Sequence, residues 1–341
     1  MSRKLLVAAL ALAAALAGIP SGASASDVPV RPVAVYDTSQ VQTTALTAAQ
    51  AMQLGEQSTG IGPGSHLLMT MDEDPGSTYG CTASYVFASG ADLLLGAAGH
   101  CFLPGDRVST HGDDADYDPA GTHVEVCVAD CTNGGLSGFV ITGRTVELGE
   151  VVYARQADGP GADAEQLGFD FGLVRIPAEL HDLVRLTMPV FGGPVTAHGE
   201  LLPGDVTCHF GHALGFGEVW PTQGRVGTGL FEDEGVWFAA APSLMGDSGS
   251  AVQTCVPSDG GLTGDAAIGT LTHLTSIGVA GTTIEKGIEL AREAGLSITL
   301  LLAGAGAPGG EEPPAGEEPA ATGKGNGGGK DKDKGGKGRR S

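Results

Sequence analysis

Positive charge is scarce in this chain. Of its 18 Lys and Arg residues, two precede residue 26 and seven follow residue 303, which leaves nine against 34 Asp and Glu residues in the body between them. Lys286 is the one lysine of that body. A strongly negative surface repels phosphates, so nucleic acid is excluded as a partner and an anionic membrane is disfavoured. Most of the acidic residues are expected on a solvated surface, which can also attract basic substrates.

A long hydrophobic run is also missing. The apolar stretch from Leu5 to Gly18 is shorter than the about 20 residues that a transmembrane helix needs. It follows Arg3 and Lys4 and is followed by Ala23-Ser24-Ala25, the pattern of a signal peptide cleaved after residue 25. An uncleaved membrane anchor is the alternative. We therefore expect residues 1–25 to be removed and the mature protein to be secreted and extracellular, with no transmembrane segment.

The rest of the chain has no fixed-period repeat and divides by composition. Residues 26–60 are expected to be an N-terminal extension or a short propeptide. Residues 61–303 contain many short apolar and β-branched runs separated by Gly, Pro, Asp and Asn, which predicts an all-β sandwich or barrel domain. Near its end, Thr282-x-x-Glu285 predicts a capping box that begins a short C-terminal helix, and Gly295 is expected to stop it.

The tail, residues 304–341, is almost entirely Gly, Pro, Glu, Lys and Ala. Such a sequence buries too little apolar surface to offset chain entropy, so a disordered tail is expected. Its basic end, residues 324–340, is either a solvated linker or a weak contact with an anionic cell surface.

Three short motifs contain the residue types needed for nucleophilic catalysis. A serine hydroxyl is a weak nucleophile that needs a neighbouring base, and that base needs a third group to fix its tautomer and orientation. The candidates are Ser248 as nucleophile, His100 as base and Asp170 as the orienting carboxylate. Their motifs are Gly246-Asp247-Ser248-Gly249, Ala97-Ala98-Gly99-His100-Cys101 and Asp170-Phe171-Gly172-Leu173-Val174.

Each motif has an ordinary interpretation when taken alone. A serine in a glycine-rich turn, a histidine in a loop and an aspartate before a strand are all common. In the serine motif, however, the glycines permit a tight turn in which the backbone N–H groups of Gly246 and Ser248 point at one oxygen. These two groups are therefore candidates for an oxyanion hole.

Taken together and in the order His, Asp, Ser, the motifs resemble those of the chymotrypsin-like (trypsin-fold) serine peptidase family, especially its bacterial secreted branch. The resemblance covers roughly residues 64–303. It implies two antiparallel six-stranded β-barrels, about 61–180 and about 181–303, with the catalytic cleft between them. It also implies a monomeric serine endopeptidase that acts on protein or peptide substrates through an acyl-enzyme. No metal or other cofactor is implied.

Six cysteines in an exported protein favour disulfides, and the sequence alone allows many pairings. The resemblance implies Cys81–Cys101 beside the histidine and Cys208–Cys255 near the serine, which leaves Cys127–Cys131. A metal pair of those last two with His123 is the alternative. An acidic stretch can also suggest a calcium site, but its spacing lacks the EF-hand pattern; it contains Asp113, Asp114, Asp116 and Asp118.

The chain departs from the family pattern at three places. His100 and Asp170 are 70 residues apart, which suggests an acidic insertion at about 104–165. No Ile-Val-Gly-Gly-like start is present to supply a new N-terminus for Asp247. Bacterial relatives have an Arg directly after the cysteine that corresponds to Cys208, whereas His209 stands here, so His209 or another base is expected to hold Asp247.

Substrate preference depends on a pocket that the resemblance assigns to Pro242, Thr272, His273 and Leu274. Without an acidic residue at Pro242, a preference for Lys or Arg is not expected. We expect apolar or aromatic side chains to be preferred, with acidic ones as the alternative because of His273. Two further alternatives remain for the whole protein, namely a catalytically inactive binding module and an esterase on the same fold. The intact His100, Asp170 and Ser248 favour the endopeptidase.

Overall fold

Strands make up most of the structure, a computed structural model that describes residues 29–133, 140–156, 164–197, 199–214 and 223–304. The expected signal peptide (1–25) and nearly all of the expected tail lie outside the described residues. The strands are β1 (Ala34–Asp37), β2 (Val41–Ala45), β3 (His66–Met71), β4 (Asp74–Thr82), β5 (Val86–Ser89), β6 (Asp92–Ala97), β7 (Thr122–Asn133), β8 (Ile141–Glu147), β9 (Val151–Arg155), β10 (Phe171–Ile176), β11 (Val206–Phe210), β12 (Gly224–Asp233), β13 (Val236–Ala240), β14 (Ala251–Ser258), β15 (Gly261–Thr275), β16 (Gly278–Thr283) and β17 (Thr299–Leu300). The helices are α2 (Ala48–Met52), α3 (Ala164–Leu167) and α4 (Ile284–Glu293), with 3₁₀ turns at Thr38–Gln40, Gly55–Gln57, Gly99–Cys101, Pro119–Gly121 and Ala178–Leu183.

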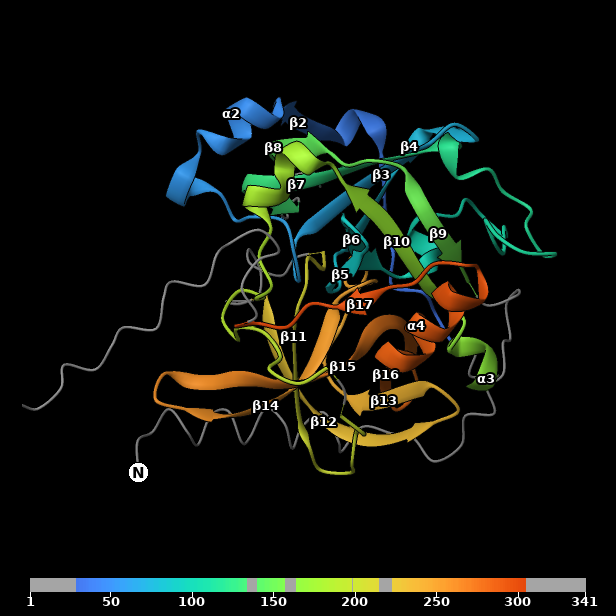
Figure 1. The fold of residues 1–341 in the computed structure, drawn as a ribbon, viewed down its shortest axis with the longest axis vertical. Helices are drawn as coiled ribbons and strands as arrows, with labels where there is room; N and C mark the ends of the chain where they lie inside the picture. The colour runs from blue at the N-terminus through green and yellow to red at the C-terminus, as the bar shows by residue number, and fades with distance from the viewer. Residues whose placement is uncertain (1–28, 134–139, 157–163, 198, 215–222, 305–341) are drawn as a thin grey trace, which may run out of the picture. The chain divides into compact units, whose positions relative to one another are not determined.

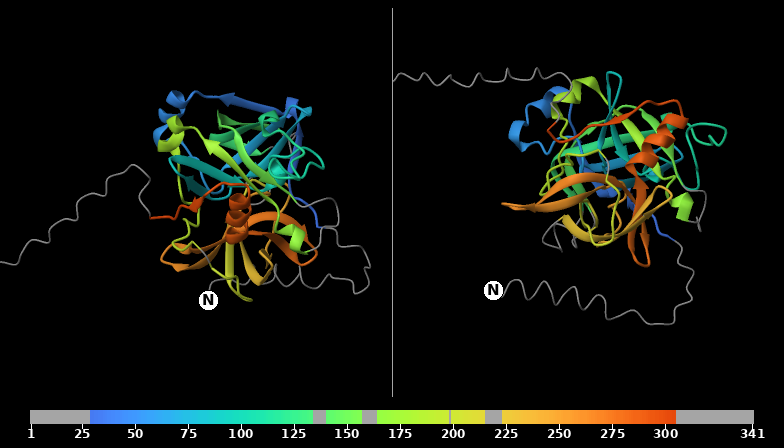
Figure 2. Two further views of the ribbon diagram at one scale, coloured as in Figure 1. Left: turned by 45° about the vertical axis from the view of Figure 1, so that its right-hand side comes forward. Right: turned by 60° about the horizontal axis from the view of Figure 1, so that its bottom comes forward.

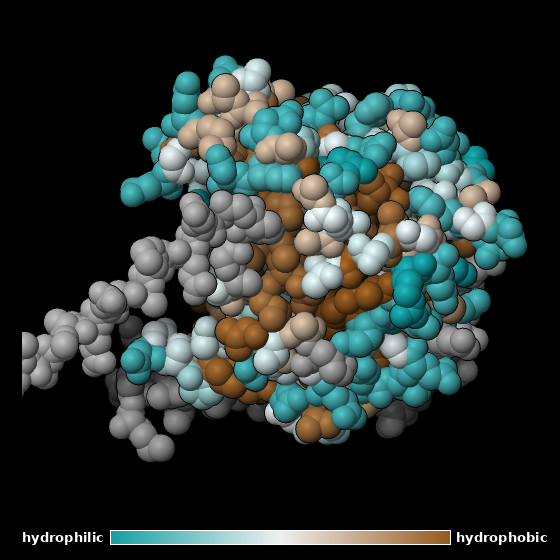
Figure 3. Space-filling model, in the orientation of Figure 1, coloured by the Kyte–Doolittle hydropathy of each residue, from teal (hydrophilic) through white to brown (hydrophobic). Residues whose placement is uncertain are grey.

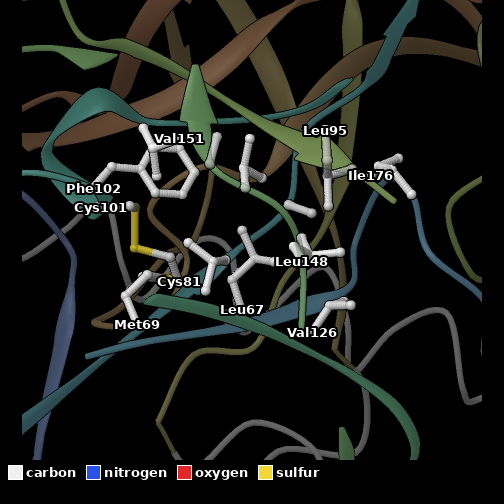
Figure 4. Packing of buried hydrophobic residues seen from close by; sticks show 14 of the residues in the cluster. Leu67, Met69, Cys81, Leu95, Cys101, Phe102, Val126, Leu148, Val151 and Ile176 are labelled. Atoms are coloured by element: carbon white, nitrogen blue, oxygen red, sulfur yellow. A yellow bond between two sulfur atoms is a disulfide. The ribbon is translucent and has the colours of Figure 1, made fainter. Parts of the chain in front are cut away.

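The first barrel consists of two curled sheets (Figure 1). One has six strands in the order β1-β4-β3-β7-β8-β2, and the other has five in the order β17-β5-β6-β10-β9. Apolar side chains from both sheets form a buried core around the Cys81–Cys101 disulfide, beside Phe102 and Met69 (Figure 4). The disulfide therefore attaches the turn that follows β6 to the end of β4.

The second barrel is closed, with the strand order β11-β12-β13-β16-β15-β14. All of its neighbouring strands are antiparallel. Trp237, Val252, Ile268 and Leu271 fill its interior and are at most 1 % exposed. The prediction of an all-β, trypsin-like fold is confirmed. The second barrel has the expected six strands, whereas the first barrel consists of one sheet of six strands and one of five.

Two segments differ from their sequence-based interpretation. The prediction of an insertion at about 104–165 is wrong for much of that range, because β7, β8 and β9 lie there and belong to the first barrel. These strands have one solvated face, so their many polar residues resemble loop composition. Residues expected in an N-terminal extension also join the barrel: β1 pairs with β4, and β2 pairs in parallel with β8.

The C-terminal helix begins one residue later than the capping pattern predicts. Thr283 is the N-cap and accepts from the N–H of Lys286, while the Thr282 hydroxyl instead donates to the carbonyl oxygen of Asp170. After the helix, Gly295 adopts a left-handed conformation with a φ of 83°. None of the described helices is both long and apolar enough to cross a membrane.

The two barrels lie against each other (Figure 2), and buried side-chain hydroxyls connect them. The Tyr85 hydroxyl donates to the carbonyl oxygen of Val252 at 2.5 Å, and the hydroxyls of Ser84 and Thr270 lie 2.8 Å apart. Helix α4 lies beside this junction, and Ile284 and Leu290 are part of its apolar cluster together with residues from both barrels. On the face shown in Figure 3, apolar side chains gather toward the middle and polar ones toward the periphery.

Several histidines are buried where the barrels meet or within the second barrel. The rings of His66 and His212 stack with their centroids 4.6 Å apart. Burial, with a contribution from His212, holds the pKa of His66 well below its usual value. Burial also lowers the pKa of His212 and of His273 to about 4, and that of His209 to about 3. These four rings are therefore neutral in the folded protein near pH 7.

We predict that the protein loses stability as the pH falls from about 6.5 to about 4. The unfolded chain takes up protons at these histidines before the folded chain does, so their contribution is complete above about pH 6.5 and is lost as the pH falls toward the folded-state pKa values. His66→Phe keeps a ring in the stack and removes one such site. Urea unfolding of this variant should show a pH slope smaller by about 1.4 kcal/mol per pH unit around pH 5.5.

The matched control is His123→Gln, because the His123 side chain is 52 % exposed. This variant should keep the slope of the parent protein. Equal slopes for His66→Phe and the parent would contradict the prediction.

Candidate active site

The register between β6 and β10 brings His100 and Asp170 together. Ala97, at the end of β6, pairs with Gly172 near the start of β10. His100 follows Ala97 in the turn Gly99–Cys101, and Asp170 comes immediately before β10. Because antiparallel strands place the end of one beside the start of the other, both residues lie at the same edge of the sheet.

A continuous hydrogen-bonded relay connects the three residues expected from the sequence. Nδ1 of His100 lies 2.6 Å from Oδ2 of Asp170, and the backbone N–H of His100 donates to Oδ1 at 3.0 Å. Nε2 of His100 lies 2.7 Å from Oγ of Ser248. Since the carboxylate only accepts, Nδ1 carries the proton and Nε2 accepts from the Ser248 hydroxyl. This arrangement can transfer the serine proton to the imidazole.

Asp170 is fully buried and still ionised. Burial acts to raise the pKa of Asp170, but the electrostatic effect of His100 and its hydrogen bond outweigh burial and lower that pKa to about 2, with smaller contributions from His273 and Arg31. Nε2 of His273 is 3.9 Å from Oδ2 of Asp170. The carboxylate can therefore stabilise a positive imidazolium on His100 without taking its proton.

The loop that contains Ser248 is shaped by two glycines with left-handed backbones. Gly246 has a φ of 104° and Gly249 a φ of 88°. A Cβ at Gly246 would collide with the carbonyl oxygen of His212, and one at Gly249 would collide with that of Thr82. No other residue fits either position without moving the loop.

The N–H groups of Gly246 and Ser248 converge on one point, as an oxyanion hole requires. Both donate to the carbonyl oxygen of Pro32, at 2.7 Å and 3.3 Å. Two such donors can stabilise an oxygen that becomes negative during acyl transfer. The contact with Pro32 has no signal in the sequence, because it joins residues more than 200 positions apart.

The charged partner of Asp247 is an arginine that lies outside all three sequence motifs. Nη1 of Arg225, on β12, donates to Oδ1 of Asp247 at 2.6 Å, and both side chains are buried. The Ser243 hydroxyl and the N–H of Leu244 both donate to Oδ2 at 2.9 Å. Burial raises the pKa of Asp247, and Arg225 and the two other donors act against that effect.

The proposal that His209 itself takes this role is wrong, although its place in the barrel is informative. His209 is paired in register with Arg225 across β11 and β12. The basic residue therefore comes from the neighbouring strand rather than from the position after Cys208. A buried carboxylate at Asp247 requires a positively charged partner. The pairing of β11 with β12 shows that this partner is Arg225.

The four residues expected in the pocket differ in burial and contacts. Pro242 is exposed, so it is not a buried pocket base. Thr272 is fully buried, and its hydroxyl lies 2.8 Å from Nδ1 of His273. His273 turns toward Asp170, whereas Leu274 presents its backbone N–H and C=O to Val30.

The structure contains the disulfides Cys81–Cys101 and Cys208–Cys255, which the resemblance implies, and Cys127–Cys131, the pair that was left. Among the described residues, the potential metal ligands that cluster are Cys81, His100 and Cys101, and both sulfurs are in a disulfide. In the acidic stretch, Asp116 accepts from the N–H groups of Val108 and Ser109.

No protein-family model matches the chain, and no curated protein matches it. Solved structures that match include Thermobifida fusca Protease A (18 % identity over 71 % of this chain and 99 % of that one, TM-score 0.38) and Cellulomonas bogoriensis chymotrypsin (15 %, 71 % and 99 %, TM-score 0.33). A Glu endopeptidase in complex with MPD matches at 13 % identity over 70 % of this chain and 96 % of that one, with a TM-score of 0.41. Similarities of this size say nothing about activity. The trypsin-like fold itself is seen in the curled sheets of the first barrel and the closed second barrel.

We predict that Arg225→Met lowers the free energy of unfolding by about 3–5 kcal/mol, because it leaves the Asp247 carboxylate buried without its counter-charge. The measurement is urea unfolding at neutral pH. Arg107→Met is the matched control, since Arg107 pairs with Glu73 at 3.1 Å with both side chains more than 40 % exposed. Losing that exposed pair should cost about 1 kcal/mol or less. Equal losses for the two variants would contradict the prediction.

Proposed function

We propose that this protein is a serine endopeptidase. In this proposal Ser248 is the nucleophile, His100 the general base and acid, and Asp170 the group that orients His100. The observation that carries the proposal is the unbroken relay from Asp170 through His100 to Ser248, with contacts of 2.6 Å and 2.7 Å. A binding protein has no need for such a relay beside two converging N–H donors.

The reaction follows from these positions. Ser248 Oγ attacks the carbonyl carbon of a peptide bond while Nε2 of His100 takes its proton. The N–H groups of Gly246 and Ser248 stabilise the oxyanion of the tetrahedral intermediate. His100 then gives the proton to the leaving amine, and an ester on Ser248 remains. Water, activated by His100, hydrolyses that ester and releases the acid.

Substrates are proposed to be extended peptides with an apolar side chain at the position before the cleaved bond. The edge of β15 at Leu274 offers one N–H and one C=O for pairing with an extended chain, a common way to bind peptides. An acidic preference has less support, because His273 is buried and its pKa is lowered to about 4. A neutral ring that faces Asp170 supplies no positive charge to a substrate.

An extracellular location is proposed as well. The three disulfides fit an oxidising compartment, and the N-terminal sequence has the pattern of a signal peptide. The negative body favours protein or peptide substrates over nucleic acid.

We predict that a fluorophosphonate probe labels Ser248, and that Ser248→Ala abolishes both the labelling and the hydrolysis of casein. Loss of the nucleophile should reduce the rate of hydrolysis by about 10⁴-fold or more. Mass spectrometry of the labelled peptide identifies the site, before and after limited proteolysis of the protein. Ser250→Ala, two residues away and also buried, is the matched control and should still be labelled.

Each alternative gives a different result in this experiment. Labelling with hydrolysis of esters but not of denatured protein would indicate an esterase. A folded protein that is never labelled, even after limited proteolysis, would contradict the proposal and indicate an inactive binding module.

A further inference from the structure

The N-terminal segment of this chain, residues 30–34, runs through the proposed active site and contacts both barrels. At one end, Val30 and Leu274 form an antiparallel pair: the Val30 N–H donates to the Leu274 carbonyl at 3.0 Å, and the Leu274 N–H donates to the Val30 carbonyl at 2.7 Å. At the other end, Ala34 begins β1 and pairs in register with Gly80 of β4. The segment is therefore extended between β15 of the second barrel and β4 of the first.

Between these two anchors, the carbonyl oxygen of Pro32 lies in the proposed oxyanion hole. It accepts from the N–H of Gly246 at 2.7 Å and from that of Ser248 at 3.3 Å. These two donors are the ones that would stabilise a reacting carbonyl. A carbonyl held by these two donors takes the place of the reacting carbonyl in the proposed mechanism, and the hydroxyl of the same Ser248 is hydrogen-bonded to His100.

The residue before Pro32 also acts on the catalytic relay. The positive charge of Arg31 contributes to lowering the pKa of both Asp170 and His273. Ser248 is 0 % exposed and His100 only 5 % exposed. A nucleophile that attacks other proteins has to be accessible, and in this structure the Pro32 carbonyl occupies the two N–H donors beside it.

We propose that the protein cleaves its own chain between Pro32 and Val33. This inference rests on the proposed peptidase function and names a substrate for it. Ser248 Oγ attacks the Pro32 carbonyl carbon and His100 takes the proton. The Pro32–Val33 C–N bond breaks, and His100 returns the proton to the Val33 nitrogen, which becomes a new N-terminal amine. A water molecule then hydrolyses the Pro32 ester on Ser248, leaving a carboxylate on Pro32 and regenerating the serine.

The two products are held very differently. The fragment that ends at Pro32 is held only by the Val30–Leu274 pair and by the contacts of its last carboxyl group, so it can dissociate. The part that begins at Val33 stays in place, because Ala34–Asp37 form the β1 strand and pair with β4 from Ser77 to Gly80. Ala34 and Tyr36 are also buried in the first barrel. Self-cleavage therefore opens the cleft without removing a strand.

The substrate class follows from the same geometry. Pro32 is buried at the position whose carbonyl is attacked, and proline has no N–H to donate there. The site thus accepts a small apolar residue at this position.

The first test compares the N-termini of the full chain and of its Ser248→Ala variant, by intact mass and N-terminal sequencing. The parent protein should begin at Val33, whereas the variant should keep the residues before it. The cleaved fraction of the parent should not depend on dilution, because the reaction is within one molecule. A parent protein that keeps the bond, or a variant that is also cut there, would overturn the inference.

A second pair of variants tests whether the segment blocks the cleft. Val33→Pro gives a bond with no N–H and a poor fit for cleavage, while Val35→Ala changes an exposed side chain on β1, directly after the segment. Val33→Pro should remain intact. It should react with the fluorophosphonate probe at least about tenfold more slowly than the parent protein, because few molecules have an open cleft at any time. Val35→Ala should be cleaved and labelled like the parent. Equal labelling of an intact Val33→Pro chain and the parent would contradict the block.

Failure of this inference can be told apart from failure of the proposed function. A parent protein that is labelled at Ser248 and hydrolyses casein with its Pro32–Val33 bond intact is a peptidase that does not process itself. Val30→Pro removes the N–H that binds Leu274 and so loosens the segment. If a folded Val30→Pro protein is not labelled, the peptidase proposal itself fails.

Discussion

Thr82 links the two barrels at the point where the proposed chemistry takes place. Its N–H donates to the carbonyl oxygen of Ser248 and its hydroxyl to that of Gly246, both at 2.8 Å. The hydroxyl oxygen also accepts from the N–H of His212. Since Thr82 follows Cys81, whose disulfide partner Cys101 is next to His100, one short stretch of chain positions both the serine loop and the histidine turn.

Among the described residues, the buried carboxylates Asp170 and Asp247 are both compensated by hydrogen-bond donors. Asp170 accepts two hydrogen bonds from His100, and Asp247 accepts three from Arg225, Ser243 and Leu244. An uncompensated carboxylate in either place would cost several kcal/mol, so these donors are needed for the loops to keep their shape. The same low-dielectric surroundings strengthen the contacts that orient His100.

The N-terminal segment occupies the proposed active site. From Val30 to Ala34 the chain is bound as an extended peptide would be, with backbone pairing at both ends and a carbonyl between two N–H donors. The hydrogen bonds come from the backbone and do not depend on side-chain identity. This explains why residues 26–60, which have no recognisable motif, could be interpreted only as an extension or a propeptide.

The sequence by itself determined the all-β class and the short helix before Gly295, and it singled out His100, Asp170 and Ser248 as candidate residues, because each depends on local pattern or on a short motif. Only the tertiary structure decided that Arg225 pairs with Asp247, that β7 to β9 complete the first barrel and that Pro32 lies against Gly246 and Ser248. These contacts join residues far apart in the chain through strand register and barrel closure. A local sequence pattern carries no record of which strands become neighbours, so it cannot specify such contacts.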